Sequence, residues 1–180
     1  NASDNDEASK IQERYPDVTV IANKTNLGFA GGNNIALPYA RGRYLMFINN
    51  DTLVEEDHNL NKLVSRLESN PKIGMVCPKI RFAWGNRPIQ YAGFTELSAI
   101  TLRNRGIGYG EADAGQYDTP SATPYAHGAA MMIRREVLEK AKPMWEGYFL
   151  YYEEMDWSLA IRHAGYEIWY EPASVIYHKE

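Results

Sequence analysis

The chain has 180 residues, of which 44% are hydrophobic and 23% charged, and its formal net charge is −4. This composition is that of an ordinary globular domain and excludes a disordered, collagen-like or low-complexity chain. No apolar run approaches the roughly 20 residues that cross a membrane. The negative balance and the lack of a basic stripe argue against a nucleic-acid partner. A single cysteine, Cys77, excludes an internal disulfide and a cysteine-based zinc site.

Residues 1–80 are predicted to alternate helices with short buried strands. In chain order we expect a helix over 7–14, a strand over 18–22, and a glycine-rich loop over 26–34 that leads into a short helix ending near residue 40. A strand over 44–48 follows. The next helix has Leu60, Leu63, Val64 and Leu67 on one face and stops at Asn70-Pro71, and a strand over 75–80 comes after it. Pro78 favours an edge or end position for that last strand. The alternation implies a largely parallel sheet, whose ligands bind in the loops after Ala22 and Ile48.

Residues 83–126 are rich in Gly, Pro, Arg and Tyr without clean periodicity, which predicts a long excursion with short strands. Regular structure then returns, with a strand over 129–133, a helix over 135–141, a helix over 154–164 that ends at Gly165, and strands over 167–170 and 174–177.

Asn49-Asn50-Asp51-Thr52 directly follows the predicted strand 44–48. A carboxylate at that point lies where such a sheet holds its ligands, and it can bind Mg²⁺ or Mn²⁺, which in turn can hold a diphosphate. These residues are also good turn formers, and Asp51 or Thr52 can instead cap the following helix.

Glu153 and Glu154 lie at the start of a predicted helix, among aromatic residues that include Tyr151, Tyr152 and Trp157. A carboxylate held there and aimed into a cleft can act as a general base, with its pKa raised by the aromatic neighbours. Acidic residues also favour helix starts because of the helix dipole alone. Both interpretations stay open on this motif.

Two further features are ambiguous by themselves. Gly28, Gly31 and Gly32 allow a ligand to approach the backbone closely. Their loop lacks the pattern of a P-loop or a dinucleotide fingerprint, so a plain strand-to-helix turn fits equally well. His178 is either a solvated side chain or a ligand.

Taken in order, these motifs resemble those of the family 2 glycosyltransferases, which are inverting sugar transferases with the GT-A fold. The matching segments are Asn1-Ala-Ser-Asp4, Asn26-Leu-Gly-Phe-Ala-Gly-Gly-Asn33, Asn49-Asn50-Asp51-Thr52 at the family's DxD motif, His127-Gly-Ala-Ala-Met-Met-Ile-Arg134, Tyr152-Glu-Glu-Met-Asp156 with Ile161-Arg-His-Ala-Gly-Tyr166, and Val175-Ile-Tyr-His178. Six motifs in one order are specific, although each alone is weak. The resemblance implies an α/β fold, Rossmann-like, with a mixed sheet flanked by helices.

The resemblance also implies roles for individual residues. Asp51 and His178 would bind a divalent metal, Mn²⁺ or Mg²⁺, and a mixed Asp/His site favours Mn²⁺. Glu154 stands at the position of the catalytic base, and Glu153 would orient the acceptor or the base. The donor nucleotide would contact Asp4, Asn26, Gly28, Asn33, Asn49, Asn50 and Asp51. The acceptor would contact Trp145, Tyr152 and Asp156, and residues 83–126 would form part of the acceptor side of the site.

The implied reaction transfers a sugar, with inversion and without a covalent intermediate, from a nucleotide-diphosphate donor to a hydroxyl of a glycan or lipid-linked saccharide. By resemblance, such enzymes build cell-surface polysaccharides on the cytoplasmic side of the membrane, so we expect a cytoplasmic protein with peripheral association to the inner membrane surface. Residues 1–180 would form one glycosyltransferase domain, with the nucleotide and metal part in 1–80 and the acceptor and catalytic-base part in 81–180.

Three departures from the family pattern bear on this expectation. Asn49 replaces the first Asp of a strict DxD motif, which leaves one certain carboxylate there. Glu154 stands where the family often has Asp, which moves the base by one methylene. The family begins with a strand, a helix and a second strand before the element matched by residues 1–4. We therefore expect a chain truncated at its N-terminus, with exposed strand edges that invite aggregation or dimerisation and with little activity in isolation.

Two other functions compete with the transferase. A noncatalytic nucleotide- or carbohydrate-binding remnant of such an enzyme would bind without turnover. A glycoside hydrolase would use Glu153 or Glu154 with Asp156, but it needs two carboxyls about 5 to 9.5 Å apart across one bond. Neighbouring residues at one helix start point in different directions, which ranks the hydrolase last.

Overall fold

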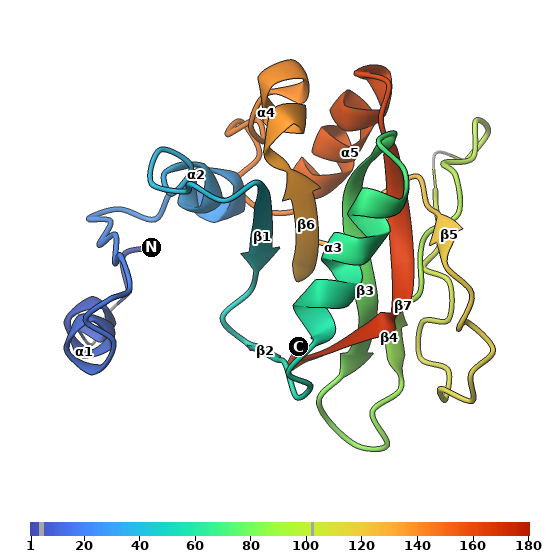
Figure 1. Cartoon of the computed structure of the whole chain (residues 1–180), viewed down its shortest axis with the longest axis horizontal. Helices are drawn as coiled ribbons and strands as arrows, with labels where there is room; N and C mark the ends of the chain where they lie inside the picture. The colour runs from blue at the N-terminus through green and yellow to red at the C-terminus, as the bar shows by residue number, and fades with distance from the viewer. Residues whose placement is uncertain (4–5, 102) are drawn as a thin grey trace.

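The structure is a computed structural model that describes residues 1–3, 6–101 and 103–180. Within them, seven strands form one sheet in the order β1-β6-β3-β7-β2, with β4 beside β3 and β5 beside β7 (Figure 1). The strands are β1 Tyr44–Ile48, β2 Thr52–Leu53, β3 Ile73–Phe82, β4 Ile89–Tyr91, β5 Ser121–Ala122, β6 Ala130–Arg134 and β7 Glu167–His178. The helices are α1 Glu7–Arg14, α2 Gly28–Asn34, α3 Asn59–Ser69, α4 Arg135–Ala141 and α5 Glu153–His163. None of these described helices has the length and apolar character that a membrane crossing requires.

The sheet is mixed, as the family resemblance implies. Of the described strand pairs only β3 and β7 run parallel, and the other five pairs are antiparallel. The prediction of a largely parallel sheet was wrong because β6 enters between β1 and β3 and runs opposite to both. Periodicity identifies a strand but carries no information on the direction of its neighbours.

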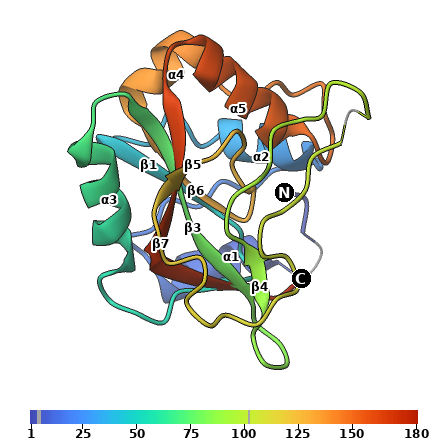
Figure 2. The ribbon, with the colours of Figure 1, turned by 90° about the vertical axis from the view of Figure 1, so that its right-hand side faces the viewer.

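Helices cover both faces of the sheet because successive strand side chains point to opposite sides. Met75 and Cys77 of β3 belong to the core cluster that contains Trp157 of α5, whereas Val76 between them packs with Leu63 of α3. Figure 2 shows the sheet nearly edge-on, with α3 on one side and α2 and α5 on the other. This arrangement brings the start of α5 close to the ends of β1 and β7, where the residues of one cavity gather.

Four parts of the predicted organisation differ in the structure. Residues 28–34, expected as a glycine-rich loop, form helix α2, and residues 35–39, expected as the helix after it, form turns. Residues 18–22 form no strand, because no described strand lies beside them to complete their backbone hydrogen bonds, and Val18 is exposed. Pro78 lies in the central strand β3 rather than at an edge, at a shift in its register with β7. Such an irregularity accommodates a residue that cannot donate to the ladder. The two predicted closing strands form one strand, β7, that continues through this shift.

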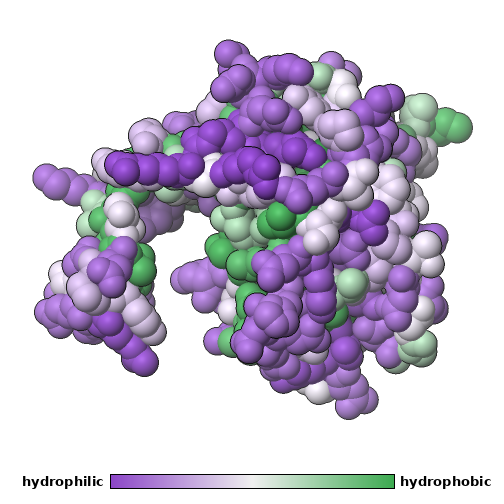
Figure 3. All heavy atoms as spheres, in the orientation of Figure 1, coloured by the Kyte–Doolittle hydropathy of each residue, from purple (hydrophilic) through white to green (hydrophobic). Residues whose placement is uncertain are grey.

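The N-terminal helix α1 lies apart from the sheet in Figure 1, and none of its residues is buried. Figure 3 shows hydrophobic surface on this arm and on the flank of the body that faces it. On that flank β1 pairs with β6 alone among the described strands, and Ile48 at its end is exposed. Among the described strands, β1 is therefore at one edge of the sheet.

The excursion over residues 83–126 carries the short strands β4 and β5, as predicted, and is tied to the core by an ion cluster. Lys79 of β3 is 2% exposed and contacts Asp113 at 3.0 Å, and it also contacts Asp118. Burial acts to raise the pKa of Asp113, but hydrogen bonds from Lys79 and the Gly115 amide outweigh it and hold that pKa below its ordinary value. The buried lysine thus anchors the excursion through its carboxylate partners.

Candidate active site

Asp51 and His178 meet where β2 pairs with the last residues of β7. Thr52 lies opposite His178 in this antiparallel ladder, and the Asp51 carbonyl accepts a hydrogen bond from the Lys179 amide at 3.0 Å. Backbone pairing thereby sets Oδ1 of Asp51 3.2 Å from Nε2 of His178. His178 is 4% exposed, so it is not a solvated side chain.

The residues around Asp51 form a turn and not a helix cap. Thr52 Oγ1 donates to the Asn49 carbonyl at 2.7 Å, and the Asn49 amide donates to the Ala129 carbonyl at 3.0 Å. Helix α3 begins after His58, whose side chain makes no capping hydrogen bond. The alternative interpretation, in which Asp51 or Thr52 caps α3, is therefore wrong, and the Asp51 carboxylate faces His178 instead.

The Asp51–His178 pair fits a divalent cation. Oδ1 of Asp51 and Nε2 of His178 are both buried, and neither has a hydrogen-bond partner. A cation bound to both would satisfy these atoms, and carboxylate with imidazole is a donor set that suits first-row metals. The described residues contain no group of three or more His, Cys, Asp or Glu side chains placed to hold a metal. The pair thus supplies two protein ligands and leaves the other positions to other oxygen donors.

A cavity of about 420 Å³ connects this pair with the start of α5. It is lined by Phe29, Asn49, Asp51, His127, Gly128, Ala129, Leu150, Tyr151, Glu153, Glu154, His178 and Glu180. The structure therefore brings together five of the predicted site residues, namely Asn49, Asp51, Glu153, Glu154 and His178.

Helix α5 presents Glu153 and Glu154 to this cavity from its first turn. The turn is held by Ser158, whose hydroxyl donates to the Glu154 carbonyl at 2.6 Å and accepts from the Ala126 amide at 3.0 Å. The helix ends at Gly165, as predicted, where φ is 90°. Ser158 thus links the backbone that carries Glu154 to the segment that leads into β6.

The two carboxylates have different surroundings. Glu153 is 3% exposed, and its Oε2 is buried without a hydrogen-bond partner. Burial raises the pKa of Glu154 above its ordinary value, and the charge of Glu153 adds to the increase. A carboxylate with a raised pKa in a cavity is suited to general-base catalysis near neutral pH. The unpartnered oxygen of Glu153 can accept a hydrogen bond from a substrate hydroxyl.

His127 lines the cavity although the sequence analysis assigned it no role. Burial lowers the pKa of its imidazole to about 4, and the nearby His178 contributes to the decrease. Its Nδ1 accepts from the Ala129 amide at 3.2 Å, so the neutral ring carries its proton on Nε2. The available signal was its place at the first position of the matched segment 127–134.

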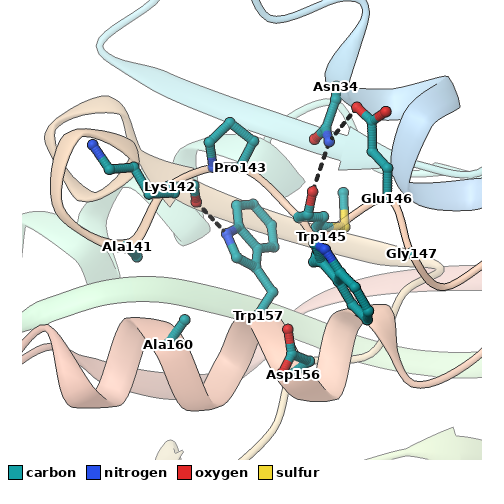
Figure 4. A pocket seen from close by; sticks show the side chains of 11 residues that line it. Asn34, Ala141, Lys142, Pro143, Trp145, Glu146, Gly147, Asp156, Trp157 and Ala160 are labelled. Atoms are coloured by element: carbon teal, nitrogen blue, oxygen red, sulfur yellow. Dashed lines mark hydrogen bonds between the residues drawn. The ribbon is translucent and has the colours of Figure 1, made fainter.

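Trp145 and Asp156 line a second cavity, of about 580 Å³, together with Asn34 (Figure 4). The Asn34 amide group donates to the Met144 carbonyl at 2.7 Å and to Glu146 at 3.0 Å. Its Oδ1 is buried without a partner, and the Trp145 side chain is exposed. The second cavity thus combines the aromatic surface of Trp145 with two oxygen acceptors, the Asp156 carboxylate and Oδ1 of Asn34.

Asn26 precedes helix α2, and Gly28 and Asn33 are part of it, so the segment expected as a glycine-rich loop is mostly helical. Oδ1 of Asn26 accepts from the Gly28 amide, and the Asn33 side chain donates to the Phe29 carbonyl, both at 2.9 Å. Gly28 has φ 71°, and a Cβ there would lie 2.3 Å from the carbonyl oxygen of Phe149. Glycine is required at this position so that α2 can pack against the segment before α5. None of the three predicted residues lines either cavity described above.

The last predicted residues lie elsewhere. Asn50 borders a third hollow, of about 330 Å³, beside residues 1–3. Tyr152 precedes α5 with φ 72°; it is exposed and lines none of the three spaces. Asp4 lies outside the residues that the structure describes.

Residues 1–141 match the family described as Glycosyl transferase family 2. The low-salt glycan biosynthesis hexosyltransferase Agl10 of Haloferax volcanii is 25% identical over 164 residues, which cover 88% of this chain and 52% of that protein. The minor teichoic acid biosynthesis protein GgaB of Bacillus subtilis is 38% identical over 73 residues, which cover 41% of this chain and 8% of that protein. The match spans about half the length of the first relative and a small part of the second.

Two solved structures share the fold. GalNAc-T7 with UDP, GalNAc and Mn²⁺ aligns with a TM-score of 0.76 and 17% identity, over 100% of this chain and 35% of that one. The mannosyltransferase PcManGT from Pyrobaculum calidifontis, in complex with GDP-Man and Mn²⁺, aligns with a TM-score of 0.67 and 20% identity, over 98% of this chain and 45% of that one. In this chain the shared architecture is the mixed sheet flanked by helices described above.

Proposed function

Because the chain belongs to glycosyl transferase family 2 and has the GT-A glycosyltransferase fold, we propose that it moves a sugar, with inversion, from a nucleotide-diphosphate donor to an acceptor hydroxyl. One observation carries the proposal: a single cavity contains a carboxylate–imidazole pair suited to a cation and a carboxylate suited to act as a base. Sugar transfer to a hydroxyl needs these two functions on opposite sides of the reacting carbon.

The diphosphate of the donor is proposed to bind at Asp51 and His178. These side chains would hold a divalent cation, which when bound neutralises the charge that grows on the leaving diphosphate. The imidazole of His178 makes the pair more favourable for Mn²⁺ than for Mg²⁺, which prefers oxygen ligands. Asn49 contributes an amide where a strict DxD motif has a carboxylate, so Asp51 is the anionic ligand of this turn.

The nucleoside is proposed to extend toward the hollow beside Asn50. In support, Asn49 and Asp51 line the first cavity while Asn50 between them borders the hollow, so one turn contacts both spaces. An amide side chain both donates and accepts hydrogen bonds, as contacts to a ribose or a base edge require. On the resemblance alone, the proposed donor contacts also include Asp4, Asn26, Gly28 and Asn33.

Glu154 is proposed as the general base. It would take the proton from the acceptor hydroxyl as that oxygen forms a bond to the anomeric carbon, while the bond to the diphosphate breaks and the diphosphate leaves with its electron pair. One displacement of this kind inverts the anomeric configuration. Glu153 would hold a substrate hydroxyl through its unpartnered oxygen. Asp156 lines the other cavity, which speaks against its pairing with Glu153 or Glu154 across one bond as in a hydrolase.

The second cavity is proposed to bind the acceptor saccharide. Its lining offers the exposed indole of Trp145 and two oxygen acceptors, the Asp156 carboxylate and the unpartnered Oδ1 of Asn34. A sugar ring presents an apolar face together with hydroxyl donors, which complements this lining. Tyr152 is exposed and lies in the sequence between Trp145 and Asp156. It is proposed to contact the acceptor outside the cavity.

The names of the relatives suggest the class of acceptor. Because they are named for glycan and teichoic acid biosynthesis, a glycan or lipid-linked saccharide used in cell-surface polysaccharide synthesis is proposed. Exposed aromatic residues over 145–152 are of the kind that lie at a membrane–water interface, which supports peripheral association with a membrane. The cytoplasmic face is proposed on the family resemblance alone. Residues 1–80 would then hold the nucleotide, and 81–180 the acceptor and the base, with His178 completing the metal site.

Transfer assays with UDP-, GDP- and dTDP-sugars in the presence of Mn²⁺ test this proposal. NMR of the product is expected to show the anomeric configuration opposite to that of the donor, and retention would refute the inverting mechanism. Nucleotide binding without any turnover would favour the noncatalytic remnant. Release of sugar from a glycoside without a nucleotide would favour the hydrolase.

A further inference from the structure

Gln90 contacts the buried side of His178. It lies on β4, and it is 4% exposed. Strands β4 and β7 flank β3, and this arrangement brings the Gln90 amide to the Nδ1 side of the imidazole, away from Asp51. Oε1 of Gln90 lies 2.9 Å from Nδ1 of His178, and Nε2 of Gln90 donates to Oε2 of Glu180 at 2.9 Å. The amide is therefore held between an imidazole and a carboxylate.

The chemistry of these contacts sets the position of the imidazole proton. A carboxylate can only accept, so Glu180 requires the NH₂ end of the Gln90 amide. The carbonyl end then faces His178, and because a carbonyl oxygen also only accepts, the proton must lie on Nδ1. In a neutral imidazole with a proton on Nδ1, Nε2 carries the lone pair.

The lone pair of Nε2 points at the metal side of the site. Nε2 lies 3.2 Å from Oδ1 of Asp51, and both atoms are buried without a hydrogen-bond partner. Glu180 Oε2 is 3.7 Å from Nδ1, too far to hold the proton there by itself. Among the described residues, the ring of His127 also packs against that of His178, at 6.3 Å between ring centroids.

We propose that Gln90 is a positioning residue, which holds His178 in the Nδ1–H tautomer and so keeps Nε2 available to a divalent cation. Metal-binding histidines are commonly oriented in this way by a hydrogen bond at the other ring nitrogen, and loss of such a partner weakens metal binding. The tautomer follows from the contacts of Gln90 alone, whereas its purpose rests on the metal site proposed above. The two parts are tested by separate measurements.

The tautomer is measured by long-range ¹H–¹⁵N correlation NMR of the histidine rings at pH 8, where an ordinary imidazole is neutral. Wild-type His178 is expected to show a protonated Nδ1, and Gln90→Leu is expected to move the proton to Nε2. Gln12→Leu on the exposed helix α1 is the matched control and should leave the spectrum of His178 unchanged. A protonated Nε2 in the wild type, or a protonated Nδ1 retained in Gln90→Leu, would overturn the inference.

A charge-conserving exchange guards against simple loss of folding. In the double variant Gln90→Glu with Glu180→Gln, a carboxylate again accepts from Nδ1–H and an amide again donates to it. This variant is expected to keep the Nδ1–H tautomer. Movement of the proton to Nε2 in the exchanged pair would also contradict the proposed role, because the acceptor at position 90 would be present without effect.

Binding of Mn²⁺ to the protein is measured by the loss of the free Mn²⁺ signal in electron paramagnetic resonance, with UDP, GDP or dTDP present. Gln90→Leu is expected to weaken Mn²⁺ binding by about 10- to 100-fold, and the exchanged pair to restore it. Unchanged affinity in Gln90→Leu would refute the role of Gln90. Absence of Mn²⁺ binding by the wild type would instead refute the proposed metal site.

Discussion

Glu154 and Asp156 are two residues apart on α5, yet they line different cavities. Helix geometry explains the separation, because residues two apart point about 200° away from each other around the axis. The proposed base and the proposed acceptor ligand therefore belong to the same helix but face different parts of the substrate. Substitutions at the two positions are expected to change different kinetic parameters.

Glu154→Gln should remove the base while leaving the donor bound. The amide cannot take the acceptor proton, so the rate of transfer is expected to fall by about 10²- to 10⁴-fold. Initial rates measure the loss, and calorimetric titration checks that the affinity for the donor nucleotide is retained. Glu139→Gln, an exposed change on α4, is the control. Near-normal transfer by the Glu154 variant would exclude this residue as the base.

The same variant should also be more stable than the wild type at neutral pH. Folding raises the pKa of Glu154, so its stabilising contribution is present below the unfolded pKa and lost as the pH rises through the folded one. A neutral glutamine avoids that loss, and the midpoint of thermal unfolding should increase at pH 7.5. Near pH 4 the advantage should shrink. A variant less stable than the wild type at pH 7.5 would contradict the burial of this carboxylate.

Changes in the second cavity should act on the acceptor. Trp145→Ala and Asp156→Asn remove a stacking surface and a charged hydrogen-bond acceptor, each worth about 1.5 kcal/mol or more, so the acceptor KM should rise about tenfold. The affinity for the donor should not change. Tyr39→Ala, at an exposed aromatic residue that lines neither cavity, is the control. Weaker donor binding with an unchanged acceptor KM would reverse the proposed assignment of this cavity.

The Lys79 cluster should control stability and not chemistry. Asp113→Ala leaves a buried ammonium with its more exposed partner Asp118 alone, and it is expected to cost about 3 kcal/mol of unfolding free energy. Lys79→Met replaces the charge with an apolar chain of similar size and should cost less. Urea denaturation measures both, with the exposed Asp17→Ala as the control. A loss below about 1 kcal/mol in Asp113→Ala would show that the contact is not an anchor.

Three residues that separate motifs singled out lie together in the structure. Asp51 after a strand and Glu154 at a helix start are local features, and the structure places both in one cavity with His178. The approach of His178 depends on the pairing of β2 with β7, which the sequence analysis did not predict; only the family resemblance gave His178 a role beside Asp51. Local patterns therefore identified the candidate residues, and the fold decided which of them are neighbours.

Other features could not be read from local patterns. The β-branched run over 18–22 has the composition of a strand, but no described strand lies beside it. Gln90 stands in a stretch without a motif, and its contact with His178 arises from the packing of β4 and β7 on either side of β3. The division of Glu154 and Asp156 between two cavities depends on how α5 is rotated against its neighbours.

The most direct test of the shared metal and nucleotide site is a calorimetric titration of UDP, GDP and dTDP with and without Mn²⁺. The wild type is expected to bind one of them only when Mn²⁺ is present, and Asp51→Ala and His178→Ala are each expected to abolish that dependence. Asp57→Ala, at an exposed residue six positions from Asp51, should behave as the wild type. Nucleotide binding that is equally strong without Mn²⁺, or that survives in Asp51→Ala, would contradict the account.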